Sequence, residues 1–181
     1  MTSIHGFYRV VSGYKQDDPL GVAYAPLEAD HLMVWDGEQI TDWSKVRFVL
    51  KDGPYADYQG NDLGWRLCSE KLRHIIEAHA DEQDKLKWLD AIVVAENGEM
   101  RDYYILYFSE PLPLDILDKK KTIFNPNDLA IVVRPCLNIT AIGNHKVFTY
   151  IGGCSPWFVS TEVRDAIIAA NCTGIELAKS C

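Results

Sequence analysis

The chain has 181 residues, of which 48% are hydrophobic and 24% are charged, and its formal net charge at pH 7 is −8. This length suits one domain with a real core, and the composition is that of a folded protein rather than a disordered chain. The negative charge argues against nucleic-acid binding, which needs a basic stripe. It permits attraction to a basic partner, although it is explained equally by solubility.

The sequence also indicates a compartment. No apolar segment reaches transmembrane length, and residues 1–5 lack the basic and apolar parts of a signal peptide. We therefore expect a cytoplasmic protein with no membrane partner. Its five cysteines are odd in number and scattered along the chain, so we expect buried free thiols rather than a disulfide framework.

The first half of the chain alternates strand-like segments with breaks. Residues 6–12 and 46–50 have strand composition, and an apolar run at 33–35 ends in the turn signal Asp36-Gly37. The segment 55–65 is rich in Gly, Asp and Asn, and it is predicted to be a loop that leads into an amphipathic helix. That helix is expected to fray around residues 81–84.

The second half is richer in strands. Residues 86–95 and 103–108 are predicted to pair through Asn97-Gly98, which tolerates the positive φ angles of a type I′ turn. A single helical turn is expected at 114–119. Further strands are expected at residues 129–133, 137–142, 147–151 and 175–178, with the second and third paired as a hairpin around Gly143-Asn144.

Two segments share one helical pattern. Ser69 opens the first and Ser160 the second, and each hydroxyl can accept a hydrogen bond from an N–H group of the first helical turn. Apolar stripes at helical spacing follow, formed by Leu72, Ile75, Ile76 and His79 in one segment and by Val163, Ala166, Ile167 and Ala170 in the other. The serine, every stripe position and an arginine recur at one constant offset, which indicates an internal duplication.

These elements define a fold class. Strands outnumber helices and hairpins are frequent, so we predict an α+β fold with a largely antiparallel sheet. The two amphipathic helices would lie in an internally duplicated strand–helix–strand arrangement. No linker rich in Pro, Gly or Ser divides the chain. We therefore expect a single domain over residues 1–181, with two lobes at approximately 1–95 and 96–181.

The sequence contains no phosphate loop, no G-x-S-x-G and no zinc motif. Two weaker pairs could still form an unrecognised hydrolase site. Cys154 follows two glycines and would need His145 nearby as its base. Asp115 and Asp118 could act as acid and base. A glycine turn entering a helix and a solvated helical turn explain these pairs more simply, so we predict no catalytic residue, no metal and no cofactor.

Several motifs occur in a recognisable order between about residues 56 and 177. They are Asp57-Tyr58, Asn61-Asp62-Leu63-Gly64, L-C-S-E-K-L-R at 67–73, L-D-I-L-D at 114–118, W-F-V-S at 157–160 and Thr173-Gly174. This pattern resembles a bacterial family first catalogued as a domain of unknown function and later assigned to the immunity proteins of polymorphic toxin systems. One departure is Lys119-Lys120-Lys121-Thr122, where members often carry a serine soon after the L-D motif.

The resemblance implies an immunity protein that binds and neutralises a cognate toxin, encoded by a neighbouring gene. The alternatives are an enzyme with an unrecognised site and a structural or regulatory interaction module. The shared motifs are caps, turns and core positions, so they do not locate the partner-binding surface. The acidic cluster Asp81, Glu82 and Asp84 is our candidate for the rim of a toxin interface, and a solvated helix end is the simpler explanation of the same residues.

Overall fold

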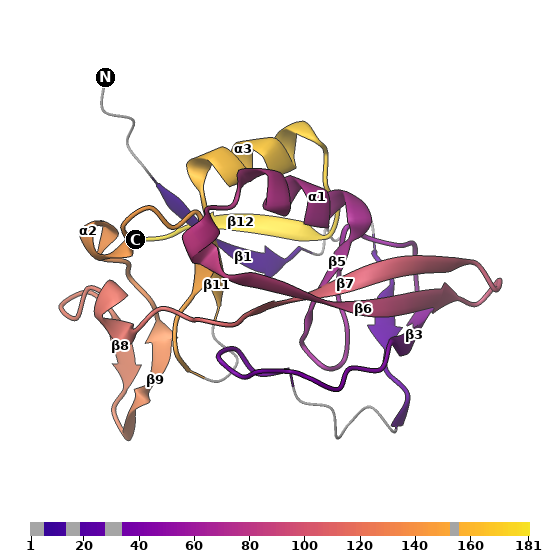
Figure 1. Cartoon of the computed structure of the whole chain (residues 1–181), viewed down its shortest axis with the longest axis horizontal. Coiled ribbons are helices and arrows are strands. Elements are labelled where there is room, and N and C mark those ends of the chain that lie inside the picture. Colours follow the sequence, from indigo (N-terminus) through magenta and orange to yellow (C-terminus); the bar gives the residue numbers. More distant parts are fainter. Residues whose placement is uncertain (1–5, 14–18, 28–33, 153–155) are drawn as a thin grey trace.

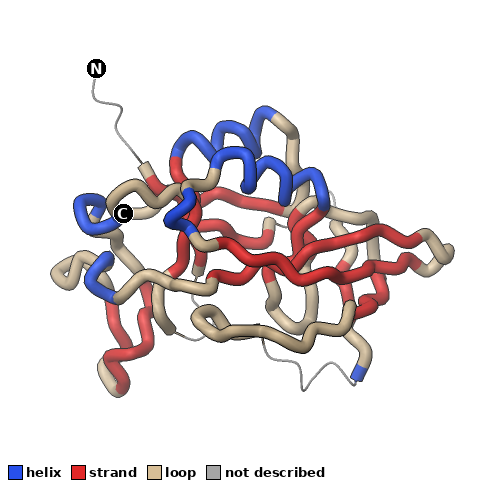
Figure 2. Tube along the Cα trace, viewed as in Figure 1, coloured by secondary structure: helices blue, strands red, loops and turns tan. Residues whose placement is uncertain are grey.

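The computed structural model of the chain describes residues 6–13, 19–27, 34–152 and 156–181. Within these residues the strands form sheets of six, four and two strands, and the two longer helices lie side by side above them (Figure 1). Figure 2 shows that strands dominate the regular structure. The predicted mixture of helices with mostly antiparallel sheets is therefore confirmed.

The six-stranded sheet has the order β2-β3-β6-β7-β5-β4. Its strands are β2 (Val22–Tyr24), β3 (Val46–Lys51), β4 (Tyr58–Gln59), β5 (Arg66–Ser69), β6 (Leu86–Ala95) and β7 (Met100–Phe108). Only β3 and β6 pair in parallel. Strand β4 lies inside the segment 55–65 that was predicted to be a loop, because pairing with β5 gives this short piece backbone partners that its composition does not reveal.

The predicted hairpin between β6 and β7 is confirmed, but its turn is not of type I′. That turn needs positive φ at both central residues. Here Gly98 has φ +85°, whereas Asn97 is not among the described residues with positive φ. The Gly98 N–H donates to the Ala95 carbonyl, and the Ala95 N–H donates to that of Glu99. The loop is thus one residue longer than a type I′ hairpin, with the glycine in the left-handed position.

The four-stranded sheet has the order β10-β11-β1-β12, and all its pairs are antiparallel. Its strands are β1 (Phe7–Ser12), β10 (Val147–Thr149), β11 (Trp157–Ser160) and β12 (Ile175–Lys179). The first and last strands of the chain are therefore neighbours. A separate ribbon of β8 (Ile123–Asn125) and β9 (Asp128–Arg134) projects from the body (Figure 1).

The predicted hairpin of residues 137–142 and 147–151 is wrong. Residues Ile139–Ile142 form a short helix, α2, and β10 pairs with β11 instead. Ile139 is exposed while Ile142 is buried under the four-stranded sheet, so packing of one side chain decides the local structure. The helical turn expected at 114–119 is shorter than predicted: it is the 3-10 helix η3 (Leu114–Ile116).

Both amphipathic helices begin where the sequence predicts. Helix α1 (Glu70–His79) follows Ser69, whose hydroxyl accepts from the Leu72 N–H at 3.2 Å. Helix α3 (Thr161–Ala169) follows Ser160, whose hydroxyl accepts from the Val163 N–H at 3.4 Å. The buried stripe positions, Leu72, Ile76, Val163 and Ile167, are at most 1% exposed. They belong to one core that also includes side chains of both larger sheets.

The strands before and after each long helix are connected and ordered in the same way. Strand β5 precedes α1 and β6 follows it, and β7 lies between them, antiparallel to both. Strand β11 precedes α3 and β12 follows it, and β1 lies between them in the same manner. The faces of the sheets away from the helices form two further cores, one centred on Phe48 and Ile105 and the other on Phe148 and Phe158.

Asp57 joins the two sheets. Its carboxylate accepts hydrogen bonds from the Ser69 hydroxyl at 2.8 Å and the Thr173 N–H at 2.9 Å, and it forms an ion pair with Lys71 at 3.1 Å. Gly174, with φ +73°, lies so close that a Cβ would be 2.4 Å from the Tyr58 carbonyl oxygen. Asp57-Tyr58, Ser69 and Thr173-Gly174, which are separate motifs in the sequence, thus meet in one contact between the segment before α1 and the turn before β12.

Truncation of the buried stripes should destabilise the protein more than loss of a cap. Ile76→Ala and Ile167→Ala should each lower the free energy of unfolding by about 2–5 kcal/mol because they leave cavities. Ser160→Ala should cost only about 0.5–2 kcal/mol. Ser69→Ala should cost more than Ser160→Ala, because Ser69 also donates to Asp57. Urea melts measure these differences, and a larger loss in Ser160→Ala than in Ile167→Ala would contradict the ranking.

Acidification should remove the stability that Asp57 contributes. Burial acts to raise the pKa of this carboxyl, but hydrogen bonds from Thr173, Ser69 and Lys71 outweigh it and hold the pKa below 3.8. Because the folded-state pKa is the lower one, the contribution is present above pH 3.8 and is lost as the pH falls through the folded-state pKa. Asp57→Asn should therefore cost about 1.5–3 kcal/mol at neutral pH. Urea melts should show a clearly smaller loss below the folded-state pKa, and an equal loss there would mean that the charge is unimportant.

Candidate functional site

A cleft of about 760 Å³ lies between the two larger sheets. One wall comes from residues 34–38 and 63–66, beside the six-stranded sheet. The other comes from the end of β1 and from residues 151–152 and 156, beside the four-stranded sheet. Cleft dimensions of this order are typical of binding sites. We refer to this feature as the inter-sheet cleft.

The base of the inter-sheet cleft is apolar and rigid. Val10, Tyr58, Leu106 and Trp157 line it, and the same four residues belong to the core beneath α1 and α3. The Tyr58 and Trp157 rings are 5.9 Å apart, and the Trp157 Nε1–H donates to the Tyr58 hydroxyl at 3.3 Å. Burial raises the pKa of Tyr58 to about 12, so its hydroxyl stays protonated at neutral pH.

A salt bridge holds one wall in place. The Arg66 guanidinium donates to both carboxylate oxygens of Asp36, each at 2.8 Å, and each side chain is only 14% exposed. Asp36 also accepts from the Phe108 N–H at 2.9 Å, and the Gly37 N–H donates to the Phe108 carbonyl. The segment 34–38 is therefore tied to the end of β7. A bidentate, partly buried pair of this kind fixes geometry as well as charge.

Two tryptophans and a carboxylate occupy this wall. Trp35 is 38% exposed. Trp65 is half-buried, and its ring lies 5.8 Å from that of Trp43 and 6.0 Å from that of Phe48. Glu38 is exposed at the edge of the cleft. Among the described residues that line the cleft, Arg66 is the only Lys or Arg, and Asp36 already neutralises it.

The acidic cluster predicted as a partner surface lies elsewhere. Residues Glu82–Asp84 form the 3-10 helix η2, capped by Asp81, where fraying was expected. Asp84 is 2% exposed, and its carboxylate accepts from the N–H groups of Lys146 and Val147 and contacts His145 at 3.0 Å. It thus fastens η2 to β10 and offers no surface to a partner. Asp81 is half-buried and Glu82 is exposed, so a toxin contact there stays a prediction for these two residues.

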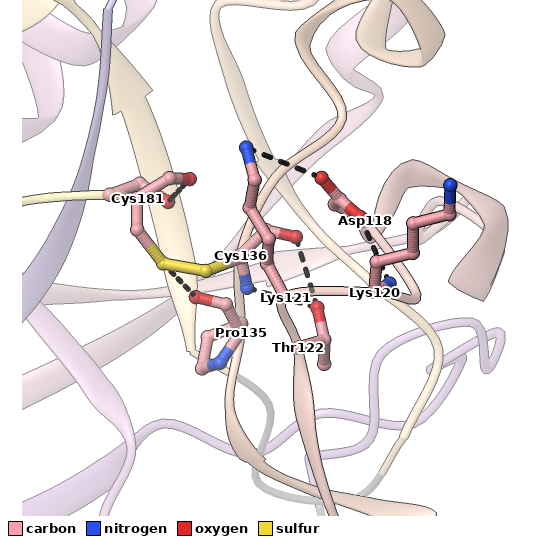
Figure 3. The surroundings of a disulfide bond; sticks show 8 residues. Asp118, Lys120, Lys121, Thr122, Pro135, Cys136 and Cys181 are labelled. Atoms are coloured by element: carbon pink, nitrogen blue, oxygen red, sulfur yellow. Dashed lines mark hydrogen bonds and ion pairs between the residues drawn. A yellow bond between two sulfur atoms is a disulfide. The ribbon is translucent and has the colours of Figure 1, made fainter.

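Of the two candidate catalytic pairs, Asp115 and Asp118 lie within the described residues, whereas Cys154 of the other pair does not. Cys154 lies outside the described residues, so its distance from His145 is not described. His145 is directed to Asp84. Asp115 is exposed on η3, whereas the Asp118 carboxylate accepts from the Lys120 N–H at 3.0 Å and pairs with Lys121 at 3.5 Å (Figure 3). Asp118 therefore shapes the turn after the L-D-I-L-D motif.

Two of the cysteines form a disulfide, so the prediction that the cysteines are free thiols is wrong for this pair. Cys136 and Cys181 are bonded, with Cα atoms 4.9 Å apart (Figure 3). Their separation of 45 positions hides this proximity, which arises because the end of the chain returns beside Leu137. Cys68 and Cys172 are free, as predicted. Burial raises the pKa of both thiols, that of Cys172 to about 11, so neither is an activated nucleophile.

Sequence inspection missed the inter-sheet cleft. Its wall residues come from segments interpreted only as an apolar run, a turn and a loop, at 33–37 and 55–65. The available signal was Trp35 beside the turn signal Asp36-Gly37 and Trp65 in a segment rich in Gly, Asp and Asn, because large aromatic side chains are unusual next to turns and in loops unless they pack or bind. In the described part of the chain, no three His, Cys, Asp or Glu side chains gather as a metal-ligand set.

Comparison with protein families identifies the class of protein: the chain is an immunity protein. It belongs to the Immunity protein family (Imm11), whose family model matches residues 13–180. The resemblance found in the motifs is thereby confirmed at the level of the family, and the protein has an immunity function of the toxin-inhibiting kind. No curated protein matches the chain. None of the described helices has the length and apolar character needed to cross a membrane.

Reduction of the disulfide should lower stability. Loss of a cross-link that closes a loop of this size typically costs about 2–4 kcal/mol. We expect Cys136→Ser to show this loss in urea melts and to be unaffected by added reductant, whereas the wild type should weaken when reductant is added. Cys172→Ser is the matched control, since that thiol is free and only partly buried. Equal stability of Cys136→Ser and wild type without reductant would show that the bond does not form.

Proposed function

We propose that the protein neutralises a cognate toxin by binding it through the inter-sheet cleft, in a stoichiometric complex without turnover. The observation that carries the proposal is the Imm11 match over residues 13–180. The cleft supports it, because its base belongs to the core and its wall carries the exposed Trp35 and the half-buried Trp65. Tryptophan side chains in concave surfaces are the residues that most often dominate the affinity of protein interfaces.

Neutralisation by binding requires high affinity. A nanomolar dissociation constant corresponds to about −12 kcal/mol, and an interface of that strength needs a desolvated centre rather than surface charge alone. The inter-sheet cleft supplies such a centre. The net charge of −8 would add attraction to a basic toxin during encounter. We further propose that the toxin is encoded by a neighbouring gene and that no nucleic acid or membrane takes part.

The site of action is proposed to be the cytoplasm. Disulfides are generally reduced there, so the Cys136–Cys181 bond would then be open in the working protein. Its reduction would affect the end of β12 and the segment before α2, and neither Cys136 nor Cys181 is among the described residues that line the cleft. The binding proposal therefore does not depend on the redox state of this pair.

We also infer that the two helix-containing units derive from a duplication within one domain over residues 1–181. The common route of the chain through β5, α1 and β6 and through β11, α3 and β12 supports this inference. Strand β1 from the first expected lobe lies in the four-stranded sheet, and β7 from the second lies in the six-stranded sheet. The unit around α1 would thus be continuous in sequence from β5 to β7, whereas the unit around α3 would take its central strand, β1, from residues 7–12.

Co-expression with the toxin domain from the neighbouring reading frame tests the function. Growth should be restored, and the two proteins should co-purify at one to one. Cys154→Ala, His145→Ala, Asp115→Ala and Asp118→Ala test the enzymatic alternative, and each should retain protection. If one of them abolishes protection while it still folds and binds the toxin, protection is enzymatic. If the wild type protects without forming a complex, binding is not the mechanism.

A further inference from the structure

We propose that the inter-sheet cleft accepts a cationic side chain, an arginine or a lysine, from a basic segment of the toxin. The side chain would stack against Trp35 and Trp65, with Glu38 as its counter-ion. This inference rests on the proposed function and specifies the chemistry of the partner at that site.

The aromatic part of the site is held ready for stacking. Trp65 packs against Trp43 and Phe48, and the Trp43 Nε1–H donates to the Asp90 carbonyl at 2.8 Å, so this group of rings is fixed in the free protein. Trp35 is more exposed than Trp65, at 38%. Tryptophan is the best aromatic partner for a cation, and the attraction increases when the cation is desolvated in a cleft.

The charge of the site favours a cation over an anion. Within the described lining, Arg66 and Asp36 cancel, which leaves the exposed carboxylate of Glu38. Asp62 and Glu110 are also exposed, and they adjoin the lining residues Leu63 and Pro111 in the chain. The protein as a whole carries a charge of −8. A toxin segment bearing Arg or Lys would therefore be attracted at long range and paired at short range.

The backbone of this wall is already held in place in the free protein. Asp36 is bonded to Arg66 and to the Phe108 N–H, which places Trp35 and Glu38 on either side of a fixed residue. The Glu38 N–H lies 3.5 Å from the Trp35 carbonyl oxygen, within the same turn. Little ordering of the wall is then required when the partner binds, and preorganisation of this kind raises affinity.

The experiment measures binding of the neighbouring-frame toxin domain to four variants by calorimetry. Trp35→Ala should weaken binding at least about tenfold, and Glu38→Lys should weaken it about tenfold or more while reducing its sensitivity to salt. Tyr24→Ala is the matched aromatic control, because Tyr24 is also 38% exposed and lies outside the cleft. Glu96→Lys is the matched charge control, since Glu96 is exposed in the β6–β7 turn. Both controls should stay within about threefold of wild type.

A charge exchange identifies the partner side chain. Arginine or lysine codons of the toxin are changed one at a time to glutamate, and one such variant should lose binding to the wild type and regain it with Glu38→Lys. Urea melts of Trp35→Ala and Glu38→Lys verify that both remain folded.

The possible results distinguish a failure of the proposed function from a failure of this inference. Failure of the wild type to bind the toxin overturns the proposed function and this inference together. Wild-type binding that Trp35→Ala and Glu38→Lys leave unchanged overturns this inference alone. Loss of binding in Trp35→Ala with no effect of Glu38→Lys shows that a neutral side chain fills the cleft, which also overturns it. If binding is weakened only by Tyr24→Ala or Glu96→Lys, the interface lies on the exposed face of β2, β3, β6 and β7. That result also overturns this inference.

Discussion

The contact between Asp57 and the turn at Thr173 is the constraint on which the rest of the structure depends. It joins the segment before α1 to the turn before β12, and so it sets the position of one sheet relative to the other. The Tyr58 N–H donates to the Thr173 carbonyl beside it, and Gly174 permits an approach that a side chain would block. A charged group with several hydrogen bonds defines a single geometry, whereas apolar packing by itself tolerates several.

The inter-sheet cleft follows from that constraint. The two sheets share one core beneath α1 and α3, and the cleft lies between them where Tyr58 and Trp157 line its base. The Arg66–Asp36 pair then closes one wall by holding an irregular segment against the end of β7. The scaffold residues and the proposed binding residues are therefore distinct sets. Asp57, Ser69 and Thr173 hold the two sheets together, while Trp35 and Glu38 line the wall of the cleft.

This separation explains what family resemblance can convey. The motifs Asp57-Tyr58, L-C-S-E-K-L-R, W-F-V-S and Thr173-Gly174 coincide with helix caps, with a tight glycine turn and with the network around Asp57. The choice of residue at such positions is restricted by the fold itself, so these motifs carry information about the fold.

The elements that depend on local interactions could be predicted from the amino-acid sequence alone. Both long helices, their serine caps, the β6–β7 hairpin and the class of fold were all predictable, because caps, turns and periodicity act within a few residues. Only the tertiary structure decided the pairing of β10 with β11, the helix in place of a strand at Ile139–Ile142, the burial of Asp84 and the Cys136–Cys181 bond. The cleft belongs to the same group. The contacts of Asp84 with residues 145–147, the Cys136–Cys181 bond and the two walls of the cleft each join segments far apart in the chain, which no local pattern records. The β10–β11 pair and the helix at Ile139–Ile142 pack in a core that also contains Phe7, so their packing is not visible in the local sequence either.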